Sequence, residues 1–331
     1  MTALPPLLQA FFAERLARQR DASPHTIASY RDSFKLLLAF LHEQTGTPPS
    51  KLTLEDLDVA RITAFLSHLE NERGNSVRTR NARLTAIHSF FQFAAFKAPD
   101  CSEQIARVLS IPEKRYQSTL VSYLTKPEID ALLAAPNRST LYGRRDHALL
   151  VLAVQTGLRA SELASLRCRD LNLDSGAWVR CHGKGRKERC TPLTRVTTKV
   201  LWVWLRELDS EPDGPLFPSR TGAHLTRAGI WRLVAKHATA ARAECPSLAA
   251  KTITPHTLRH SAAMQLLSAP EPVDTATIAL WLGHETLDTT NKYVHADMEL
   301  KRRAVNRTTP PNVKPGRYRP PDRLLAFLES L

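Results

Sequence analysis

Apolar residues recur at the three-to-four-residue spacing of one helix face across the first hundred residues of the chain. Ser23 and Pro24 supply an N-cap and a proline at the first helical position, and Gly46 followed by Pro48 and Pro49 ends this helix. The apolar positions that share one face between these limits are Ile27, Tyr30, Phe34, Leu37, Leu38 and Leu41. The pattern predicts four or five helices in residues 1 to about 100.

Two more helices are expected in the same region. Thr53 and Asp56 have the spacing of a capping box and predict a helix that stops near Gly74, and a last helix begins at about Ser76. Their apolar positions are Val59, Ile62, Phe65, Leu66 and Leu69 in the first, and Leu84, Ile87, Phe90, Phe91 and Ala94 in the second. These side chains should form the core of a small helical bundle, residues 1–110.

The helical pattern weakens between Pro99 and Ser122, where Pro112 to Arg115 form a polar stretch between two apolar regions. We interpret residues 111–121 as a linker and hinge, because domain boundaries fall in exposed polar or proline-containing segments. Residues 122–308 are then a second domain. Residues 309–331 form a proline-rich tail with a short apolar helix from Arg323 to Leu328.

The second domain mixes helices with strands. Thr125 and Glu128 resemble a capping box, a very apolar helix runs from Leu141 to Gln155, and Gly157 breaks it. Strands are expected at Leu171 to Leu173, Trp178 to Cys181 and Glu188 to Thr191, and the glycine-containing turn at 182–187 predicts a hairpin between the last two. Further helices are expected around Leu201 to Leu205, at Thr226 to about Ala241, from Pro255, at Ile278 to Leu282, from Thr286 to Tyr293 and at Ala296 to about Arg303. The fold class is therefore mainly α with a small β-sheet (α+β).

Charge narrows the class of partner. Lys and Arg number 46 and Asp and Glu number 32, so the net charge is +14. Residues 1–110 carry 13 basic and 11 acidic side chains, which leaves 33 and 21 for the remainder. This excess favours a polyanionic partner for the second domain.

The five cysteines form no Cys-x-x-Cys pair, and their odd number fits a disulfide framework poorly. We read them as reduced thiols. The sequence has no signal-peptide pattern and no apolar stretch of membrane-spanning length, so we expect a soluble, cytoplasmic protein without a membrane partner.

Tyr293 stands downstream of an ordered set of basic residues. The set is Arg159, Lys184, His256, Arg259 and His284. A phenol, with a pKa near ~10, is almost wholly protonated at neutral pH, so a tyrosine nucleophile needs cations that stabilise the developing negative charge. Guanidinium groups meet that need on a phosphate, which they grip with two hydrogen bonds. The set indicates an enzyme that cuts and rejoins DNA through a phosphotyrosine.

Three segments resemble the motifs of the tyrosine recombinases, the phage-integrase and Xer-type family. They are Thr156-Gly157-Leu158-Arg159-Ala160-Ser161-Glu162-Leu163, His256-Thr257-Leu258-Arg259-His260, and Leu282-Gly283-His284 followed by Tyr293. The resemblance covers nearly the whole chain and implies an N-terminal SAM-like core-binding domain and a catalytic domain that close around DNA as a C-shaped clamp. One departure is the segment 268–274, which is longer and richer in proline than the turn expected there, and which we expect to alter a surface loop only.

The resemblance also implies a role for each site residue. Tyr293 is the nucleophile, Lys184 is the candidate general acid with Lys187 as its competitor, and Arg159, His256, Arg259 and His284 act on the phosphate. Glu162 is expected to fix the orientation of Arg159. His260 is expected to point elsewhere and support packing. Taken singly, Arg159 reads as a helix cap, Lys184 as a solvated loop residue and His256 as a capping or core histidine.

Candidate DNA contacts lie outside these motifs. Arg80 and Arg83 lie three residues apart on one face of the last helix of the first domain, with Arg78 close by. The resemblance implies phosphate contacts from Arg78, Arg80 or Arg83, and a solvated helix surface is the alternative. Arg227, Arg232 and Lys236 lie on the helix from Thr226, which either enters a DNA groove or turns this polar side to water.

The implied reaction is site-specific recombination. Tyr293 attacks a DNA phosphate to give a 3′-phosphotyrosine and a 5′-hydroxyl, and a hydroxyl of a partner strand reverses the step. Neither ATP, a metal ion nor another cofactor is expected, because the bond energy is kept in the intermediate and the sequence has no phosphate-cradling loop or metal-ligand cluster.

The partners implied are double-stranded DNA with a specific recombination site and a homotetramer on two such sites. A monomer or dimer without DNA, accessory DNA-bending or partner recombinase proteins, and docking of the C-terminal helix in cis or in trans stay open. The outcome, whether integration, excision, transposition or dimer resolution, stays open too. Two alternatives are a type IB topoisomerase and a DNA-binding regulator with a decayed site.

Overall fold

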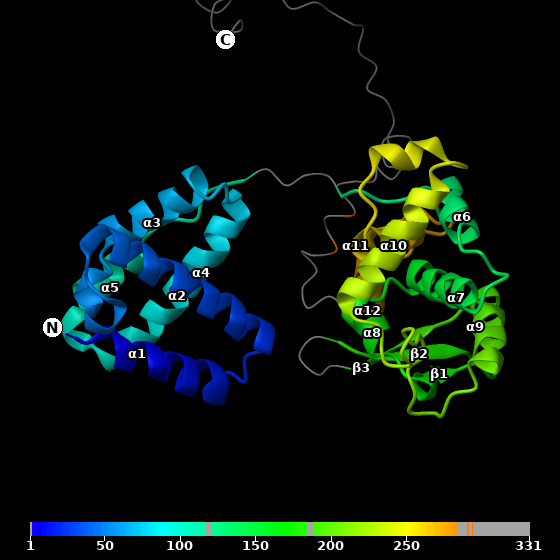
Figure 1. Cartoon of the computed structure of the whole chain (residues 1–331), viewed down its shortest axis with the longest axis horizontal. Helices are drawn as coiled ribbons and strands as arrows, with labels where there is room; N and C mark the ends of the chain where they lie inside the picture. The colour runs from blue at the N-terminus through cyan, green and yellow to red at the C-terminus, as the bar shows by residue number, and fades with distance from the viewer. Residues whose placement is uncertain (1, 117–120, 184–187, 284–289, 291–292, 294–331) are drawn as a thin grey trace, which may run out of the picture. The chain divides into compact units, whose positions relative to one another are not determined.

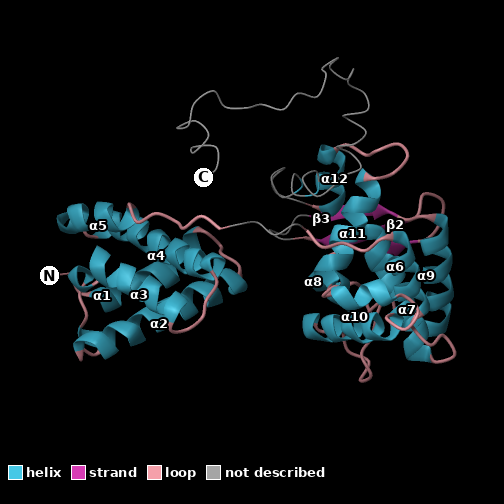
Figure 2. Ribbon diagram, turned by 90° about the horizontal axis from the view of Figure 1, so that it is seen from above, coloured by secondary structure: helices cyan, strands magenta, loops and turns pink. Residues whose placement is uncertain are grey.

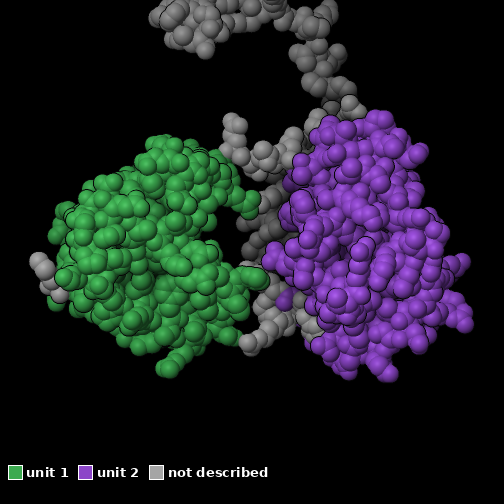
Figure 3. All heavy atoms as spheres, in the orientation of Figure 1, with its two compact units in different colours: residues 1–119 green, residues 120–331 purple. Residues whose placement is uncertain are grey.

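The computed structural model describes residues 2–116, 121–183, 188–283, 290 and 293. The chain forms two compact units, residues 1–119 and 120–331 (Figure 3). This division falls within the segment 111–121, which the sequence predicts as a linker. Among the described residues, no helix is both long enough and apolar enough to cross a membrane.

The first unit is a bundle of helices (Figures 1 and 2). Its described elements are α1 (Leu4–Ala10), which continues into a π-helical segment (Phe11–Gln19), α2 (Pro24–Thr45), α3 (Val59–Asn71), α4 (Val77–Lys97) and α5 (Ser102–Leu109). Phe11, Phe34 and Phe90 are buried at its centre, and their ring centroids lie 5.3 to 6.2 Å apart in edge-to-face arrangements. Such ring pairs stabilise a core beyond the apolar area that they bury.

Local capping sets the starts of α2 and α4 and the end of α2. The Ser23 side chain accepts a hydrogen bond from the Thr26 amide at 3.2 Å, and Gly46 ends α2 with a φ of 69°, as the sequence predicts. Ser76 caps α4 in the same way. These limits are confirmed.

Two predictions about the first unit were wrong. The capping box at Thr53 and Asp56 opens only a 3-10 turn (Leu54–Asp56), because Leu57 leaves helical geometry to become fully buried, and α3 begins after the separate N-cap Asp58. The second is α5, which lies inside the stretch read as poorly patterned. Its short core-facing side, formed by Ile105 and Val108, is too brief to give a clear helical period.

The second unit surrounds one apolar helix. Its described helices are α6 (Lys126–Ala134), α7 (Leu141–Thr156), α8 (Ala160–Ser165), α9 (Arg195–Leu208), α10 (Arg227–Ala241), α11 (Pro255–Leu267) and α12 (Thr275–Leu282). The helix α7 packs against α6, α9 and α11, and most of its residues from Ala148 onward are buried (Figure 1). From Ala148 to Val154 this helix is apolar on all sides and must be covered on all sides, so this part of α7 forms the centre of the unit.

A small antiparallel sheet lies beside these helices (Figure 2). Its strands, in the order β1-β2-β3, are β1 (Leu171–Asn172), β2 (Trp178–His182) and β3 (Glu188–Pro192). The register pairs His182 with Glu188 and Trp178 with Pro192. The pairing confirms the predicted hairpin, although its tip at 184–187 lies outside the described residues.

Two glycines in left-handed conformation shape the turns that lead to the site. Gly157 ends α7 with a φ of 65°, and Gly283 ends α12 with the same φ. A Cβ on Gly157 would lie 2.6 Å from Leu282 Cδ2 and 3.1 Å from Ala262 Cβ, so the two turns and α11 pack tightly here. Glycine is needed at residue 157 both for its φ and for this close approach.

We predict that Gly157→Ala destabilises the second unit more than Gly176→Ala does. Both glycines have positive φ, which costs alanine about 1–2 kcal/mol, but the Cβ of residue 176 meets nothing within 4 Å. Overpacking against Leu282 should add about 1–3 kcal/mol at residue 157. All 5 tryptophans follow residue 120, so urea denaturation followed by tryptophan fluorescence reports on this unit. Equal losses for the two variants would contradict the tight packing.

Candidate active site

The first arginine of the site is placed by the junction between α7 and α8. After the Gly157 turn the chain is extended at Arg159, which is the N-cap residue of α8. Its amide donates to Glu162 Oε2 at 2.8 Å and its Nη1 donates to Glu162 Oε1 at 2.9 Å. The predicted link between Glu162 and Arg159 is therefore present, and it fixes the direction of the guanidinium.

Glu162 is a buried anion shared by two arginines. It is 3% exposed, and Arg189 of β3 also grips it through Nη1 to Oε1 at 3.0 Å and Nη2 to Oε2 at 2.8 Å. Burial alone would raise the pKa of Glu162, but the hydrogen bonds and charges of Arg189 and Arg159 hold that pKa below its ordinary 4.5. The carboxylate is charged at neutral pH and ties β3 to α8.

Arg259 reaches the same region from α11. It is 2% exposed, and its Nη1 and Nη2 donate to the carbonyl oxygens of Gly157 at 2.8 Å and Leu282 at 2.6 Å. Burial first, and then the charge of Arg159, lower the pKa of Arg259 to about 10. It remains a cation at neutral pH, so two positive groups stand side by side at this point.

Three guanidinium groups converge on the turn that ends α12. Arg189 Nε donates to the carbonyl of Trp281 at 3.2 Å, Arg259 to that of Leu282, and Arg159 Nη2 to that of Gly283 at 3.0 Å. Arg189 was not predicted from the sequence. Its signal was its two-residue spacing from Thr191 on β3, because alternate residues of a strand share one face, and the register pairs Arg189 with the buried Cys181. No short motif marks such a position.

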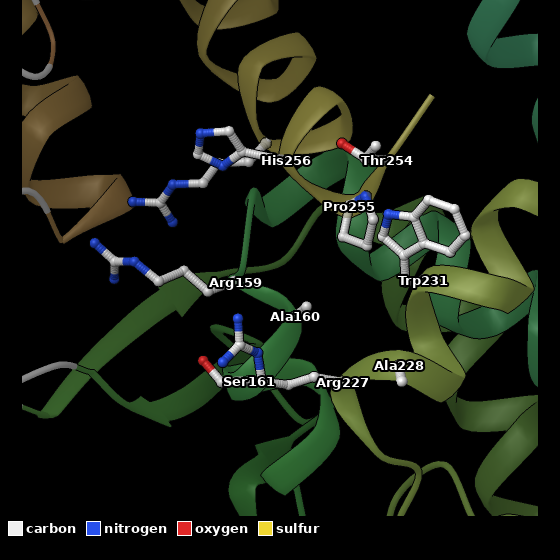
Figure 4. A pocket seen from close by; sticks show the side chains of 10 residues that line it. Arg159, Ala160, Ser161, Arg227, Ala228, Trp231, Thr254, Pro255 and His256 are labelled. Atoms are coloured by element: carbon white, nitrogen blue, oxygen red, sulfur yellow. The ribbon is translucent and has the colours of Figure 1, made fainter. Parts of the chain in front are cut away.

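An open pocket of about 660 Å³ lies in front of these groups. Its lining includes Arg159, His256 and Arg259, together with Arg227 and the exposed ring of Trp231 from α10. Figure 4 shows the side chains of Arg159 and His256 projecting toward one side of the pocket, with Trp231 on the other. Paired guanidinium groups beside an imidazole suit the non-bridging oxygens of a phosphate.

Tyr293 is buried in a small apolar cluster with Met264, Ile278 and Leu282. Its side chain is 2% exposed, and the hydroxyl lies 3.0 Å from Nδ1 of His260. Burial raises the pKa of the phenol above its ordinary value, and the charges of Arg259 and Arg159 oppose this rise without cancelling it. The positive charges of both arginines thus act on the phenol of Tyr293, the nucleophile predicted from the sequence.

The prediction that His260 points elsewhere was wrong. His256 and His260 lie four residues apart on α11 and so share one face, and their ring centroids are 4.2 Å apart. The rings of His260 and Tyr293 meet edge to face, with their centroids 5.4 Å apart. Helical spacing alone indicates this shared face, but not that Tyr293 folds back onto it.

The structure brings together four of the predicted catalytic residues. Arg159 and Arg259 meet at the α12 turn, His256 lines the pocket with both, and Tyr293 is joined to His256 through the ring of His260. Lys184, its competitor Lys187, and His284 lie outside the described residues. Within the described ranges, no group of three or more His, Cys, Asp or Glu residues is arranged to hold a metal ion.

The predicted DNA contacts differ in their surroundings. Arg80 is 5% exposed and donates to Asn81 Oδ1 at 3.0 Å and the Pro112 carbonyl at 3.2 Å, so it faces the protein interior and its placement opposes a phosphate contact. Arg78 is exposed and Arg83 half-buried, where burial and then Arg73 lower the pKa of Arg83.

On α10, the three candidates are exposed. Arg232 and Lys236 lie on the outer surface of this helix, and Arg227 lines the pocket.

Comparison with known proteins matches both parts of the chain. The sequence profile described as the phage integrase family matches residues 122–299, and that of the phage integrase N-terminal SAM-like domain matches residues 9–97. The chain is 54% identical over 329 residues to a putative integrase/recombinase, y4rC, of Sinorhizobium fredii, covering 99% of this chain and 98% of that protein.

More distant relatives agree. The chain is 33% identical over 319 residues to tyrosine recombinase XerC of Chlamydia muridarum, covering 92% of this chain and 98% of that protein. It also resembles, with a TM-score of 0.69 and 25% identity, the XerH site-specific recombinase bound to its palindromic difH substrate in a post-cleavage complex, covering 87% of this chain and 81% of that chain.

We predict that Glu162→Gln destabilises the second unit by about 3–5 kcal/mol at neutral pH, because it leaves two buried or half-buried guanidinium groups without their anion. The folded-state pKa of Glu162 lies below 4.5, so its charged form stabilises the fold above that pH and loses this effect as the pH falls. The gap between parent and variant should therefore narrow in acid. Urea denaturation followed by tryptophan fluorescence measures the gap at each pH.

The control is Asp130→Asn, which removes the exposed ion pair with Lys126, whose side chains are 77% and 56% exposed. An exposed pair of this kind contributes about 0.5 kcal/mol or less. A similar loss of unfolding free energy for both variants would show that burial does not make the ion pairs of Glu162 more stabilising than an exposed pair.

Proposed function

This chain belongs to the phage integrase family of tyrosine recombinases, and we propose that it is a site-specific recombinase in which Tyr293 cuts and rejoins DNA. The family confirms the resemblance read from the sequence, and the described elements confirm a mainly α fold with a small sheet. The observation that supports Tyr293 as the nucleophile is its position beside Arg159 and Arg259, whose charges both act on its phenol.

The site supports a specific division of labour during cleavage. Arg159 and Arg259 hold the two non-bridging oxygens of the scissile phosphate, and His256 donates to the same group. Tyr293 Oη forms a bond to phosphorus while the bond from phosphorus to the 5′-oxygen breaks. That oxygen takes a proton from Lys184, our proposed general acid, and leaves as a hydroxyl. His284 is proposed to donate to the phosphate from the end of the α12 turn.

Rejoining is the same step in reverse. The 5′-hydroxyl of a partner strand attacks the 3′-phosphotyrosine, and Tyr293 leaves. Each step exchanges one phosphoester bond for another, so no nucleotide hydrolysis is needed. The arginines supply the positive charge on the phosphate that a metal ion supplies in other phosphoryl-transfer enzymes, and we propose a reaction without ATP or a metal ion.

We propose double-stranded DNA carrying a specific recombination site as the substrate. Strand exchange between two sites needs four active sites, which supports a homotetramer on two DNA duplexes, formed by monomers or dimers in the absence of DNA. Residues 1–110 are the proposed core-binding domain, residues 122–308 the catalytic domain, and the two close on DNA as a C-shaped clamp through the linker 111–121. Since its substrate is DNA, we place the protein in the cytoplasm.

Several DNA contacts are proposed on exposed or half-buried side chains. Arg78 and Arg83 are candidates in the first unit, and Arg227, Arg232 and Lys236 in the second. The tail at 309–331, which lies outside the described residues, is proposed to dock on a neighbouring subunit. Accessory DNA-bending or partner recombinase proteins remain candidates for a reaction that the purified protein does not complete alone.

We predict that the parent protein forms an SDS-resistant adduct with nicked suicide substrates made from the DNA flanking its gene, and that Tyr293→Phe forms none while still binding. The phenylalanine variant keeps the ring but lacks the attacking oxygen. Addition of EDTA and omission of ATP should leave the adduct yield unchanged. An adduct from both proteins would move the nucleophile to another residue. Relaxation of supercoiled plasmids without the site would instead favour a topoisomerase.

We predict that Arg227→Ala lowers DNA affinity and reduces the dependence of log K on log salt by about 0.9, the value for one lost phosphate contact on duplex DNA. Arg227 lines the pocket beside Arg159 and His256. The matched control is Arg206→Ala, an exposed arginine stacked on Trp202 of α9 that does not line this pocket. Fluorescence anisotropy over a salt series measures both slopes. The same slope for Arg227→Ala and the parent would remove Arg227 from the phosphate contacts.

A further inference from the structure

His260 contacts the atom that must react. Its Nδ1 lies 3.0 Å from Tyr293 Oη, and the two rings meet at an interplanar angle of 64°. An imidazole nitrogen at this distance accepts a hydrogen bond from a phenol when the other ring nitrogen carries the proton. This geometry is within the 2.6 to 3.2 Å reach that a general base needs.

Tyr293 requires a proton acceptor because its surroundings disfavour the phenolate. At its ordinary pKa only about one phenol in a thousand is ionised at neutral pH. Burial raises the pKa of Tyr293 further, and Arg259 and Arg159 offset only part of that rise. The guanidinium groups of both arginines are already protonated and carry donors only, so neither can take the proton.

The two histidines of α11 face different partners. His256 lines the pocket with Arg159 and Arg259, where a phosphate fits, whereas His260, one turn along, contacts Tyr293. Their ring centroids lie 4.2 Å apart in an edge-to-face arrangement. The two imidazoles therefore lie side by side on one face of α11, between the pocket and Tyr293. A residue whose only role was to pack the helix would not need its nitrogen on the reacting oxygen.

We propose that His260 is a catalytic residue that accepts the phenolic proton of Tyr293. As Oη bonds to phosphorus, the O–H bond breaks and the proton passes to Nδ1. The leaving 5′-oxygen takes its own proton from the separate general acid. When the strand is rejoined, the phosphorus–Oη bond breaks and His260 returns the proton to the departing phenolate. This inference rests on the proposed recombinase activity.

The test measures the rate of adduct formation on nicked suicide DNA by His260→Asn. Asparagine can hydrogen-bond to Tyr293 but cannot accept its proton, so cleavage should fall by about 10²-fold or more. Urea denaturation and DNA binding check that the variant folds and binds as the parent does. A rate equal to that of the parent would reduce His260 to a positioning role and overturn the proposal.

A second measurement separates proton transfer from loss of fold. Replacement of Tyr293 alone by 3,5-difluorotyrosine makes the phenol far more acidic, so a much larger fraction of the attacking oxygen is ionised without a proton acceptor. This replacement should restore most of the cleavage rate in His260→Asn. The control is His256→Asn, which acts at the phosphate and should not be restored. Failure to restore His260→Asn, or equal restoration of both variants, would refute the proton-acceptor role.

Failure of the proposed recombinase reaction gives a different experimental result from failure of the proposed role of His260. If the parent forms no adduct on any substrate that it binds, the proposed recombinase reaction is wrong and the role of His260 falls with it. If the parent reacts and His260→Asn reacts equally well, the recombinase reaction stands and the role of His260 alone is rejected.

Discussion

The buried carboxylate of Glu162 is the point on which the geometry of the site depends. It is the shared acceptor for Arg159 and Arg189, and those two arginines also hold the turn at Trp281 and Gly283. One anion thereby links α8, β3 and the end of α12, three elements far apart in the sequence. Without its charge, the same cluster would be a set of neighbouring cations that repel one another in a poorly solvated region.

Local signals account for most of what the sequence predicts correctly. Capping at Ser23, Ser76 and Thr125 and the glycine at residue 157 set helix limits through contacts within a few residues, which a sequence displays directly. The motifs around Arg159 and Arg259 are equally short. The hairpin was predicted for the same reason, since strand alternation and a glycine-containing turn are local properties.

The wrong and missed predictions concern residues whose conformation or partner is decided by tertiary contacts. Thr53 forms its capping box, but burial of Leu57 stops the helix there and moves its start to Val59. Arg80 occupies a helix position that is typical of a solvated arginine, yet its guanidinium bonds the Pro112 carbonyl, 32 residues away. Arg189 and His260 gain their roles only from partners on other elements. No spacing rule within one segment identifies such partners.

The contacts of Arg80 and Asn81 shorten the chain segment that connects the two units. Arg80 holds Pro112, and Asn81 donates to the carbonyl of Lys114, while Lys251 in the other unit donates to that of Tyr123. The chain between the contacts at Lys114 and at Tyr123 is residues 114–123, which can span at most about 30 Å when fully extended. In the DNA clamp proposed above, a connection this short would make binding of the second unit to the same duplex an intramolecular event, at an effective concentration on the order of millimolar. The proposed DNA contacts of the two units would then combine into a higher affinity than either unit has alone.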